Sequence, residues 1–203
     1  MKVLYFTNPD ITDPEVIPGI ISKQGDEVVI YTKKINLDYI IENNIEYIVS
    51  DRSRSLIGLD VINHLSKRII NLHPSYLPFG RGYNANYWTI VEGSPIGVTI
   101  HYIDEGIDTG DILLQTQVFY DQGDTLKTTY DRLRYFMVEL FRASWGHLRV
   151  GNIPAKKQNI NEGSLHMKKE FENIFPKLPN GWGTKISDLV LERKSRDASS
   201  SEG

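Results

Sequence analysis

An apolar stretch that ends in a polar pair and a proline limits the fold of this chain more than any other feature. Arg68-Ile69-Ile70 runs into Asn71-Leu72-His73-Pro74, and a short apolar run of this kind is typical of a buried strand. Residues two apart in a strand point to the same side, so Asn71 and His73 face together. Pro74 lacks an N–H and restricts His73 to extended geometry, which ends the strand there. The polar pair is therefore expected at the carboxyl end of a strand, where open α/β sheets bind their ligands.

The residues before this strand alternate between apolar runs and segments with helical features. The runs predict strands at residues 3–6, 28–31 and 47–49, and the intervening segments predict helices at 13–24, 37–41 and 60–67. The first helix is expected to begin at Asp13 as N-cap, with Pro14 in its first turn. Strands alternating with helices form a mostly parallel sheet with right-handed crossovers. We therefore predict an α/β, Rossmann-like fold with helices on both faces of the sheet.

The residues after Pro74 predict an antiparallel edge and one long helix. A helix is expected at 84–92, and strands at 96–103 and 112–118 are joined by the Asp- and Gly-rich loop 104–111, which is short enough for an antiparallel pair. From Thr125 to about Gly151 the apolar residues follow helical spacing, as in a helix that packs on a core. These residues are Leu126, Tyr130, Leu133, Met137, Leu140 and Leu148.

Charge and composition argue against several classes of protein. The net charge of −3 provides no basic field that would attract nucleic acid, and no stretch approaches the roughly 20 apolar residues of a membrane span. The chain contains no cysteine, which excludes disulfides, thiolate zinc sites and a cysteine nucleophile and agrees with a cytoplasmic location. No Gly-x-Gly-x-x-Gly follows the first strand, so a nicotinamide enzyme is not expected.

Three polar residues form a candidate catalytic set. Asn71 and His73 end a strand, and Asp108 lies on a loop between two apolar runs. A histidine, whose ordinary pKa is about 6.5, suits a general base. An aspartate can orient the imidazole of such a histidine, and an asparagine amide can donate a hydrogen bond. His101 and Asp111 would complete an imagined metal site with His73 and Asp108, but no metal-binding spacing supports it, and we predict none.

Three blocks around these residues resemble the folate-dependent formyltransferase family. They are Asn71-Leu72-His73-Pro74-Ser75, Gly97-Val98-Thr99 and Asp108-Thr109-Gly110, and they match the family's Asn-x-His-Pro/Gly-Ser, Gly-Val-Thr-like and Asp-x-Gly elements in order and in approximate spacing. The resemblance covers roughly residues 45 to 120. It implies formyl transfer from 10-formyltetrahydrofolate to a small-molecule amine. His73 would act as base, Asp108 would orient it, and Asn71 would donate to the oxyanion.

The resemblance also implies where the folate donor binds. In the family, the pteridine enters a slot formed by the stretch before the Asn-x-His strand and by the loop before the catalytic aspartate. By position, the slot residues here are Ser55, Leu56, Ile57, Ile62, Ile103, Asp104, Glu105 and Gly106. Such a slot needs apolar walls edged by backbone donors and acceptors, and Leu56 and Ile57 can supply the walls. The alternative is that both are ordinary core residues.

The acceptor is expected to contact the segment that follows the catalytic turn. Arg81 can pair with a phosphate or carboxylate, while Tyr83 or Trp88 can stack on a ring. Asn84 adds an amide, and His101 shares its strand with Thr99. The alternative is that the aromatic residues pack the following helix and that Arg81 is solvated.

Within the family, the run from Tyr76 to Asn84, with Trp88 beyond it, resembles the sugar N-formyltransferases most closely. This resemblance implies an amino sugar as acceptor, linked to dTDP or UDP. A glycinamide ribonucleotide enzyme should carry a Gly/Ser-rich loop after its first strand, where this chain has Asn8-Pro9-Asp10. A methionyl-tRNA enzyme should carry a further domain and a basic surface. Another small primary amine, such as glycinamide ribonucleotide, and a non-catalytic folate- or nucleotide-binding module stay open as alternatives.

The predicted organisation has three parts. Residues 1–155 form the catalytic domain, residues 156–193 form a small extension packed on it, and residues 194–203 form a disordered polar tail. Residues 158–184 of the extension are expected to be irregular. The aromatic residues from Tyr83 to Trp88, or the apolar set Ile186, Leu189, Val190 and Leu191, are candidate faces for a homodimer.

Overall fold

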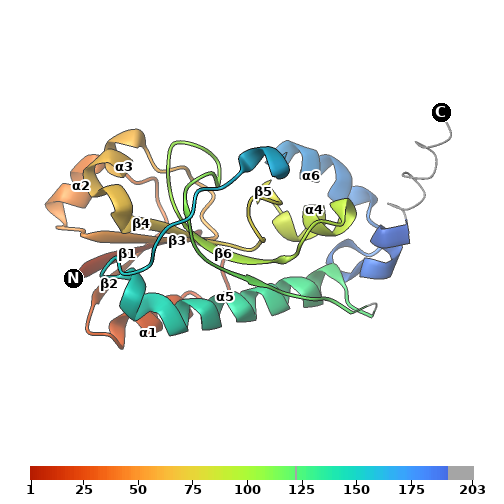
Figure 1. The fold of residues 1–203 in the computed structure, drawn as a ribbon, viewed down its shortest axis with the longest axis horizontal. Coiled ribbons are helices and arrows are strands. Elements are labelled where there is room, and N and C mark those ends of the chain that lie inside the picture. Colours follow the sequence, from red (N-terminus) through yellow and green to blue (C-terminus); the bar gives the residue numbers. More distant parts are fainter. Residues whose placement is uncertain (122, 192–203) are drawn as a thin grey trace. The chain divides into compact units, whose positions relative to one another are not determined.

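The computed structural model describes residues 1–121 and 123–191 (Figure 1). The chain divides into two compact units. The first unit comprises Met1–His73, Thr99–Leu114 and Met137–Gln158, and the second comprises Pro74–Val98, Gln115–Phe136 and the residues from Asn159 onward. The predicted tail 194–203 lies outside the described residues.

A six-stranded sheet has the order β2-β1-β3-β4-β6-β7. Its strands are β1 (Lys2–Phe6), β2 (Glu27–Tyr31), β3 (Tyr47–Asp51), β4 (Ile69–His73), β6 (Gly97–Tyr102) and β7 (Ile112–Gln117). The pairs β1/β2, β1/β3 and β3/β4 are parallel, whereas β4 and β6 are antiparallel. The predicted α/β fold, mostly parallel with an antiparallel edge, is confirmed.

Helices cover both faces of this sheet in the first unit (Figure 1). The helices α2 (Leu37–Glu42) and α3 (Leu59–Leu65) lie on one face, and α1 (Val16–Ser22) lies on the other with the end of α5 (Leu126–Leu148). The α2/α3 face buries an apolar cluster: Leu4, Phe6, Ile35, Ile40, Ile45, Ile48, Ile57, Val61, Leu65 and Ile69. Side chains of alternate strand residues therefore supply the core of this face.

Two predicted helices can be compared with their observed bounds. The first begins at Val16 rather than at Asp13, because the Asp13 carboxylate accepts a hydrogen bond from Arg52 at 2.6 Å and does not cap the helix. The long helix was predicted correctly, and Leu126, Leu133 and Met137 of its expected stripe are buried. The apolar stripe predicted the helix because side chains 3 or 4 residues apart share one face.

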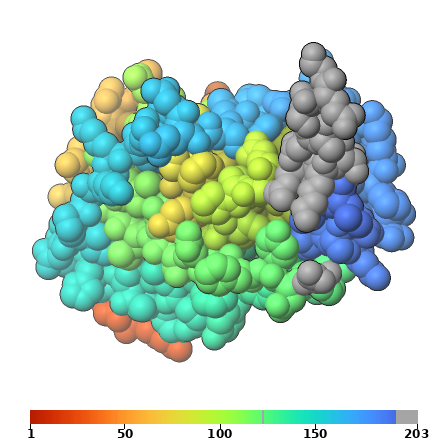
Figure 2. Space-filling model, turned by 45° about the vertical axis from the view of Figure 1, so that its right-hand side comes forward, coloured from red at the N-terminus to blue at the C-terminus, as the bar shows by residue number. Residues whose placement is uncertain are grey.

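The second unit contains short elements. A two-stranded parallel sheet joins β5 (Arg81–Gly82) to β8 (Leu165–His166). Besides the first part of α5, its helices include α4 (Ala85–Glu92) and α6 (Lys168–Ile174). Single 3₁₀ turns occur at Ile160–Glu162, Phe175–Lys177 and Gly181–Gly183; another, Ser66–Arg68, precedes β4 in the first unit. In Figure 2 the blue C-terminal segment lies beside the yellow-green residues of α4.

The prediction that residues 158–184 are irregular was wrong for α6. This helix is seven residues long, which is too short for a clear helical period in the sequence. Its start is stabilised by the Glu170 carboxylate, which accepts a hydrogen bond from the Met167 N–H at 2.8 Å. This bond, followed by that to the His166 ring, lowers the pKa of Glu170. Phe171 on the inner face of the helix is 5% exposed and packs against Tyr87.

Among the described residues, no helix is both long and apolar enough to cross a membrane.

A buried ion pair joins Asp26, the residue before β2, to Arg149, the residue after α5, and we expect its loss to lower stability strongly. The Asp26 side chain is fully buried and accepts hydrogen bonds from Trp145 Nε1 at 3.1 Å and from the Arg149 guanidinium, and it also pairs with the amino group of Met1. Asp26→Ala should lower the free energy of unfolding by about 3–5 kcal/mol, because it leaves a partly buried cation unpaired. Urea denaturation measures this loss.

The matched control for this change is Asp131→Ala. Asp131 pairs with Lys127 one helical turn away, but both side chains are more than half exposed. Exposed pairs of this kind contribute about 0.3–0.5 kcal/mol. An equally small effect for both variants would contradict the structural role of Asp26.

A second stability prediction concerns acid. Asp124 accepts two hydrogen bonds from the Arg132 guanidinium at 2.6 and 3.1 Å, one from the Asp121 N–H and one from Thr128 Oγ1. These bonds, chiefly those from Arg132, lower the pKa of the Asp124 carboxyl. The unfolded chain therefore binds a proton more readily, and the stabilisation present above the ordinary pKa of about 3.9 is lost as the pH falls further.

Asp124→Asn should flatten this part of the pH dependence. Chemical denaturation of both proteins between pH 6 and pH 3 measures it. The wild-type protein should lose more stability than the variant as the pH falls. Equal losses would show that Asp124 makes no contribution to acid unfolding.

Candidate active site

The carboxyl end of β4 holds two of the predicted catalytic residues. Asn71 and His73 are two apart in the strand and share one side, which is the side of Ile69 and the α2/α3 core. Across the antiparallel pair, Asn71 is opposite His101 and His73 is opposite Thr99. The register therefore brings three predicted site residues together on one face of the sheet.

Asp108 completes the cluster from the loop between β6 and β7. Its Oδ2 lies 3.5 Å from His73 Nδ1 and its Oδ1 lies 3.5 Å from His101 Nε2. Asn71 Nδ2 donates a hydrogen bond to Oδ1 at 3.2 Å. His73 is 4% exposed and His101 is 1% exposed. The carboxylate thus contacts two buried imidazoles and one amide.

The hydrogen bonds of His101 define its tautomer. Its Nδ1 lies 2.7 Å from the carbonyl oxygen of Tyr102, and a carbonyl oxygen only accepts, so Nδ1 carries the proton. In a neutral ring, Nε2 then accepts from Asn71 Nδ2, which lies 3.2 Å away. Both ring nitrogens are therefore occupied by protein groups, and His101 orients Asn71. Its predicted contact with the acceptor stays a prediction.

The backbone of the loop that carries Asp108 has an unusual conformation. Asp108 has φ +52°, a left-handed geometry that only a few residue types adopt readily. Gly110 lies so close to Tyr102 that an added Cβ would overlap its carbonyl oxygen. Tyr102 N–H also donates to the Asp111 carbonyl oxygen at 3.0 Å. The Asp-x-Gly motif therefore combines a residue that tolerates left-handed geometry with one that allows close approach.

Three of the predicted folate residues lie at the α2/α3 core of the first unit. Ile57 is 9% exposed and belongs to the α2/α3 core, and Ile62 and Ile103 pack against that core. Leu56 is 76% exposed, and the role of both residues in a folate slot stays a prediction. Asp104 Oδ1 accepts from Gly106 N–H at 3.1 Å and from Thr109 Oγ1 at 2.6 Å, which shapes the loop.

Ser55 and Glu105 lie at exposed positions. Ser55 N–H donates to the Ser53 hydroxyl at 3.2 Å in an exposed turn, and Glu105 is exposed. The polar stretch before them is paired with the loop after β1, since Arg54 contacts the Asp10 carboxylate at 2.8 Å.

The predicted acceptor residues Arg81, Tyr83, Asn84 and Trp88 belong to the second unit. Arg81 is 9% exposed and donates to the carbonyl oxygen of Ile160 at 3.4 Å, but no carboxylate pairs with it among residues 1–121 and 123–191. Tyr83 packs edge-on against Phe171. Asn84 has φ +57° just before α4. The relation of these residues to the catalytic set stays a prediction.

Trp88 has a ring partner that the sequence did not indicate. His166 stacks on Trp88, with ring centres 3.7 Å apart and an angle of 5° between the planes. Carboxylates face both nitrogens of His166: Glu92 lies 2.5 Å from Nε2 and Glu170 lies 3.0 Å from Nδ1. The His166 ring covers one face of the Trp88 indole, so a ligand that stacks on Trp88 would use the other face.

Sequence reasoning missed one residue that contacts the catalytic loop. Gln158 Nε2 donates to the carbonyl oxygens of Asp108 at 3.0 Å and of Gly110 at 2.6 Å. Gln158 lies 50 residues after Asp108 and belongs to no recognisable motif. Its local sequence, Lys156-Lys157-Gln158-Asn159, is typical of an exposed polar loop, so no sequence signal indicates the contact.

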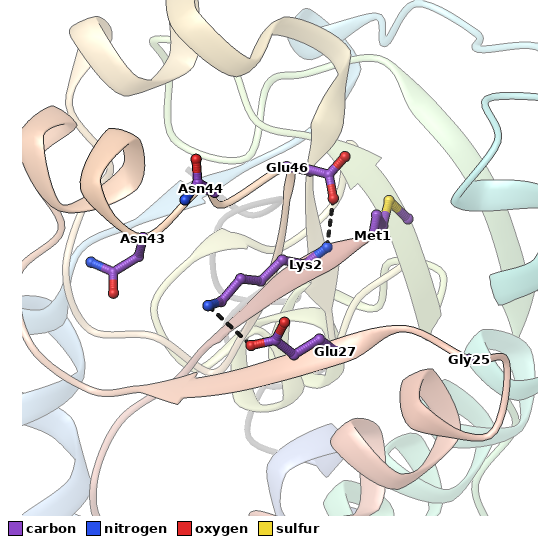
Figure 3. A pocket seen from close by; sticks show the side chains of 7 residues that line it. All are labelled: Met1, Lys2, Gly25, Glu27, Asn43, Asn44 and Glu46. Atoms are coloured by element: carbon purple, nitrogen blue, oxygen red, sulfur yellow. Dashed lines mark hydrogen bonds and ion pairs between the residues drawn. The ribbon is translucent and has the colours of Figure 1, made fainter.

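A separate groove of about 640 Å³ lies at the amino ends of β1 and β2 (Figure 3). Its lining residues are Met1, Lys2, Gly25, Glu27, Asn43, Asn44 and Glu46. Lys2 pairs with Glu27 through its side chain at 3.0 Å and with Glu46 through its main-chain N–H at 2.7 Å. The groove lies at the end of the strands opposite to Asn71 and His73. In the described part of the chain, no group of three or more His, Cys, Asp or Glu residues could hold a metal ion.

The fold and the site together define an α/β protein with a cluster of two histidines, an aspartate and an asparagine at the carboxyl edge of its sheet. A buried imidazole next to a carboxylate and an amide can move a proton and stabilise charge on a carbonyl oxygen. A family model described as Formyl transferase matches residues 25–143, which is more than half of the chain. The chain belongs to the formyl transferase family, as its sequence blocks predicted.

Individual relatives cover different shares of the chain. The formyltransferase PseJ from Anoxybacillus kamchatkensis, solved in complex with UDP-4,6-dideoxy-4-formamido-L-AltNAc and tetrahydrofolate, is 38% identical, with a TM-score of 0.86 over 94% of this chain and 98% of its own. A dTDP-4-amino-4,6-dideoxyglucose formyltransferase from Mycobacterium tuberculosis is 35% identical over 53% of this chain and 45% of its own length. The match thus spans less than half of that protein. A methionyl-tRNA formyltransferase from Clostridioides difficile is 29% identical over 86% of this chain and 68% of its own length.

Proposed function

We propose that this chain is an N-formyltransferase that moves a formyl group from 10-formyltetrahydrofolate to the amine of a nucleotide-linked amino sugar. The observation that carries the proposal is the contact of the Asp108 carboxylate with His73 and Asn71 at the end of β4. The similarity to PseJ over nearly the whole of both chains supports the same reaction. The donor supplies an activated formyl carbon, and the protein must bind it and manage one proton.

His73 is the proposed base. Its Nδ1 faces Asp108, so Nε2 is the nitrogen that takes the proton from the attacking amine. The cation that forms is then stabilised by the Asp108 carboxylate. A carbon–nitrogen bond forms to the acceptor amine as the bond to the donor nitrogen breaks. The proton held on His73 can be passed to that leaving nitrogen, which balances the reaction without a further reactant.

Asn71 is the proposed donor to the formyl oxygen. Its Nδ2 is within 3.2 Å of both His101 Nε2 and Asp108 Oδ1, so one of these bonds must give way when the oxygen becomes negative. We expect the bond to the neutral His101 ring to be exchanged, because a donor that meets an oxyanion forms a stronger bond than one that meets a neutral acceptor. One such donor contributes roughly 3–4 kcal/mol to transition-state stabilisation.

The donor is proposed to bind against the α3 side of the sheet. Ile57 belongs to the apolar cluster there, Ile62 and Ile103 pack against it, and Leu56 is exposed in the preceding segment, so these residues would form the apolar wall. The main chain of Asp104, Glu105 and Gly106 offers polar groups at the edge of this wall. A flat apolar slot with a polar edge suits a pteridine ring.

The acceptor is proposed to be anionic as well as an amine. Arg81 is a nearly buried cation without an acidic partner among the described residues, and a buried charge of this kind is costly unless a ligand pairs with it. A diphosphate would supply that charge. Tyr83 and the exposed face of Trp88 are the proposed ring-stacking groups, with Asn84 as a polar contact.

We also propose the predicted organisation, with residues 1–155 as catalytic domain and the segment up to 193 as extension. All three catalytic residues lie before residue 155. The cytoplasmic location and the homodimer expected from the sequence stay predictions. Glycinamide ribonucleotide is the rival acceptor, and a non-catalytic binding module is the rival class.

Release of tetrahydrofolate from 10-formyltetrahydrofolate tests the proposal. The assay compares UDP- and dTDP-linked amino sugars with glycinamide ribonucleotide and with a no-acceptor control. Release that depends on one nucleotide sugar is the expected result. Release with glycinamide ribonucleotide alone would keep the chemistry and overturn the acceptor. Absence of both turnover and folate binding would overturn the whole assignment.

A further inference from the structure

Asp108 lies on a loop whose main chain accepts hydrogen bonds from a side chain outside the loop. Asp108 adopts φ +52°, and its carbonyl oxygen and that of Gly110 both accept from the side chain of Gln158. The carboxylate of Asp104 stabilises the earlier part of the loop through Gly106 and Thr109. Gln158 therefore holds the later part of the loop, because it donates to the residues on either side of Thr109.

The orientation of the Gln158 amide follows from its partners. Carbonyl oxygens only accept hydrogen bonds, so the amide must present its Nε2 to both of them, and both of its hydrogens are used. The Oε1 atom is buried and has no hydrogen-bond partner among the residues that the structure describes. Reversing the amide would place three oxygens together. The loop carbonyls therefore select this orientation at the expense of Oε1.

The main chain carries Gln158 to the loop. Ile112 and Lys156 exchange two backbone hydrogen bonds, each of 2.8 Å, as an isolated antiparallel bridge. This bridge aligns the segment after α5 with the start of β7, directly after the loop. Gln158, two residues beyond Lys156, then reaches back to Asp108 and Gly110. The bridge and the side chain together form one clamp on the loop.

We propose that Gln158 is a positioning residue for formyl transfer, because its two hydrogen bonds hold the Asp108 carboxylate opposite His73. The role of Gln158 in turnover rests on the proposed function. Its effect on the position of the Asp108 carboxylate can be tested in the free protein. One residue of the proposed extension therefore contacts the loop that carries Asp108. Gln158 contacts no reacting atom and acts only through the main chain of the loop.

Gln158→Met tests the proposal, because methionine is similar in size and donates no hydrogen bond. Loss of the clamp should let the carboxylate move away from His73 and weaken its stabilisation of the imidazolium. We expect kcat to fall roughly 10- to 100-fold, as for other residues that orient a catalytic group, while KM for the acceptor changes less than twofold. Gln24→Met, at an exposed position of the same unit, is the matched control.

A readout without turnover separates this proposal from the proposed function. Histidine NMR titration of the free protein follows the protonation of His73. The midpoint should move to lower pH in Gln158→Met, since a carboxylate close to an imidazole favours the charged form. The same shift is expected for Gln158→Asn, which keeps the amide but shortens the side chain, and this variant is the second test should the methionine variant not fold.

The outcomes decide the proposal in each case. A shifted midpoint in the variants with no shift in Gln24→Met supports it, even where no acceptor is turned over and the proposed function fails. An unchanged midpoint overturns it, and a fall in kcat without a shift would assign Gln158 a merely structural role.

Discussion

Replacing His73 with alanine should reduce kcat by roughly 10²- to 10⁴-fold, which is the usual contribution of a general base. The imidazole is 4% exposed and its Nδ1 faces the Asp108 carboxylate. We therefore expect no water-exposed group to replace it as the base in the same position. Binding of the folate donor should survive, because the proposed slot residues lie elsewhere, in the segment before α3, on α3 itself and on the loop after β6. Steady-state kinetics and equilibrium binding of tetrahydrofolate measure the two effects separately.

His64→Ala is the matched control for this change. His64 lies on α3 in the same unit, but it is exposed and has no place in the catalytic set. Its replacement should leave kcat within about twofold of the wild type, as expected of a surface substitution. Turnover of His73→Ala at the wild-type rate would show that the base has been assigned to the wrong residue.

Asp108→Asn should cost roughly 10³- to 10⁴-fold in kcat, as does a comparable change in a histidine–aspartate pair. Asparagine has the same shape and tolerates the left-handed backbone at φ +52°, so the loop should keep its conformation. The amide carries no charge to stabilise an imidazolium. Where it donates to His73 Nδ1, it also forces the ring proton onto Nε2, which can then no longer accept one.

Asp38→Asn is the matched control for the loss of one negative charge. Asp38 is an exposed residue in the first turn of α2 in the same unit. Circular dichroism and thermal unfolding establish that each variant is folded before its kinetics are compared. A kcat of Asp108→Asn within threefold of the wild type would remove the carboxylate from the mechanism.

The part of the site that could be predicted from the sequence is the part set by local rules. Asn71 and His73 share a side because they are two apart in a strand, and Pro74 ends that strand. The apolar runs of β1, β3 and β4 likewise predicted a parallel sheet. Asp108 was predicted from the Asp-x-Gly pattern, and the structure explains Gly110 by the close approach of Tyr102.

Contacts between distant positions could not be predicted in this way. Gln158 meets Asp108 across 50 residues, and no periodicity relates two such loops. The start of α1 was misplaced because Asp13 pairs with Arg52, 39 residues away, instead of capping its own helix. Helix α6 was missed because its seven residues depend on the contact of Phe171 with Tyr87. In each case a tertiary partner decided between local alternatives.

The order in which these pieces occur along the chain has a consequence for protein synthesis. The parallel pairs β1/β2, β1/β3 and β3/β4 of the six-stranded sheet join residues between Lys2 and Leu72, so a nascent chain leaving the ribosome can assemble this half of that sheet early. The loop of Asp108 is clamped only when Lys156 has paired with Ile112. A chain released by the ribosome before that point would contain His73 and Asp108 but would not hold them together, so premature termination should yield an inert product.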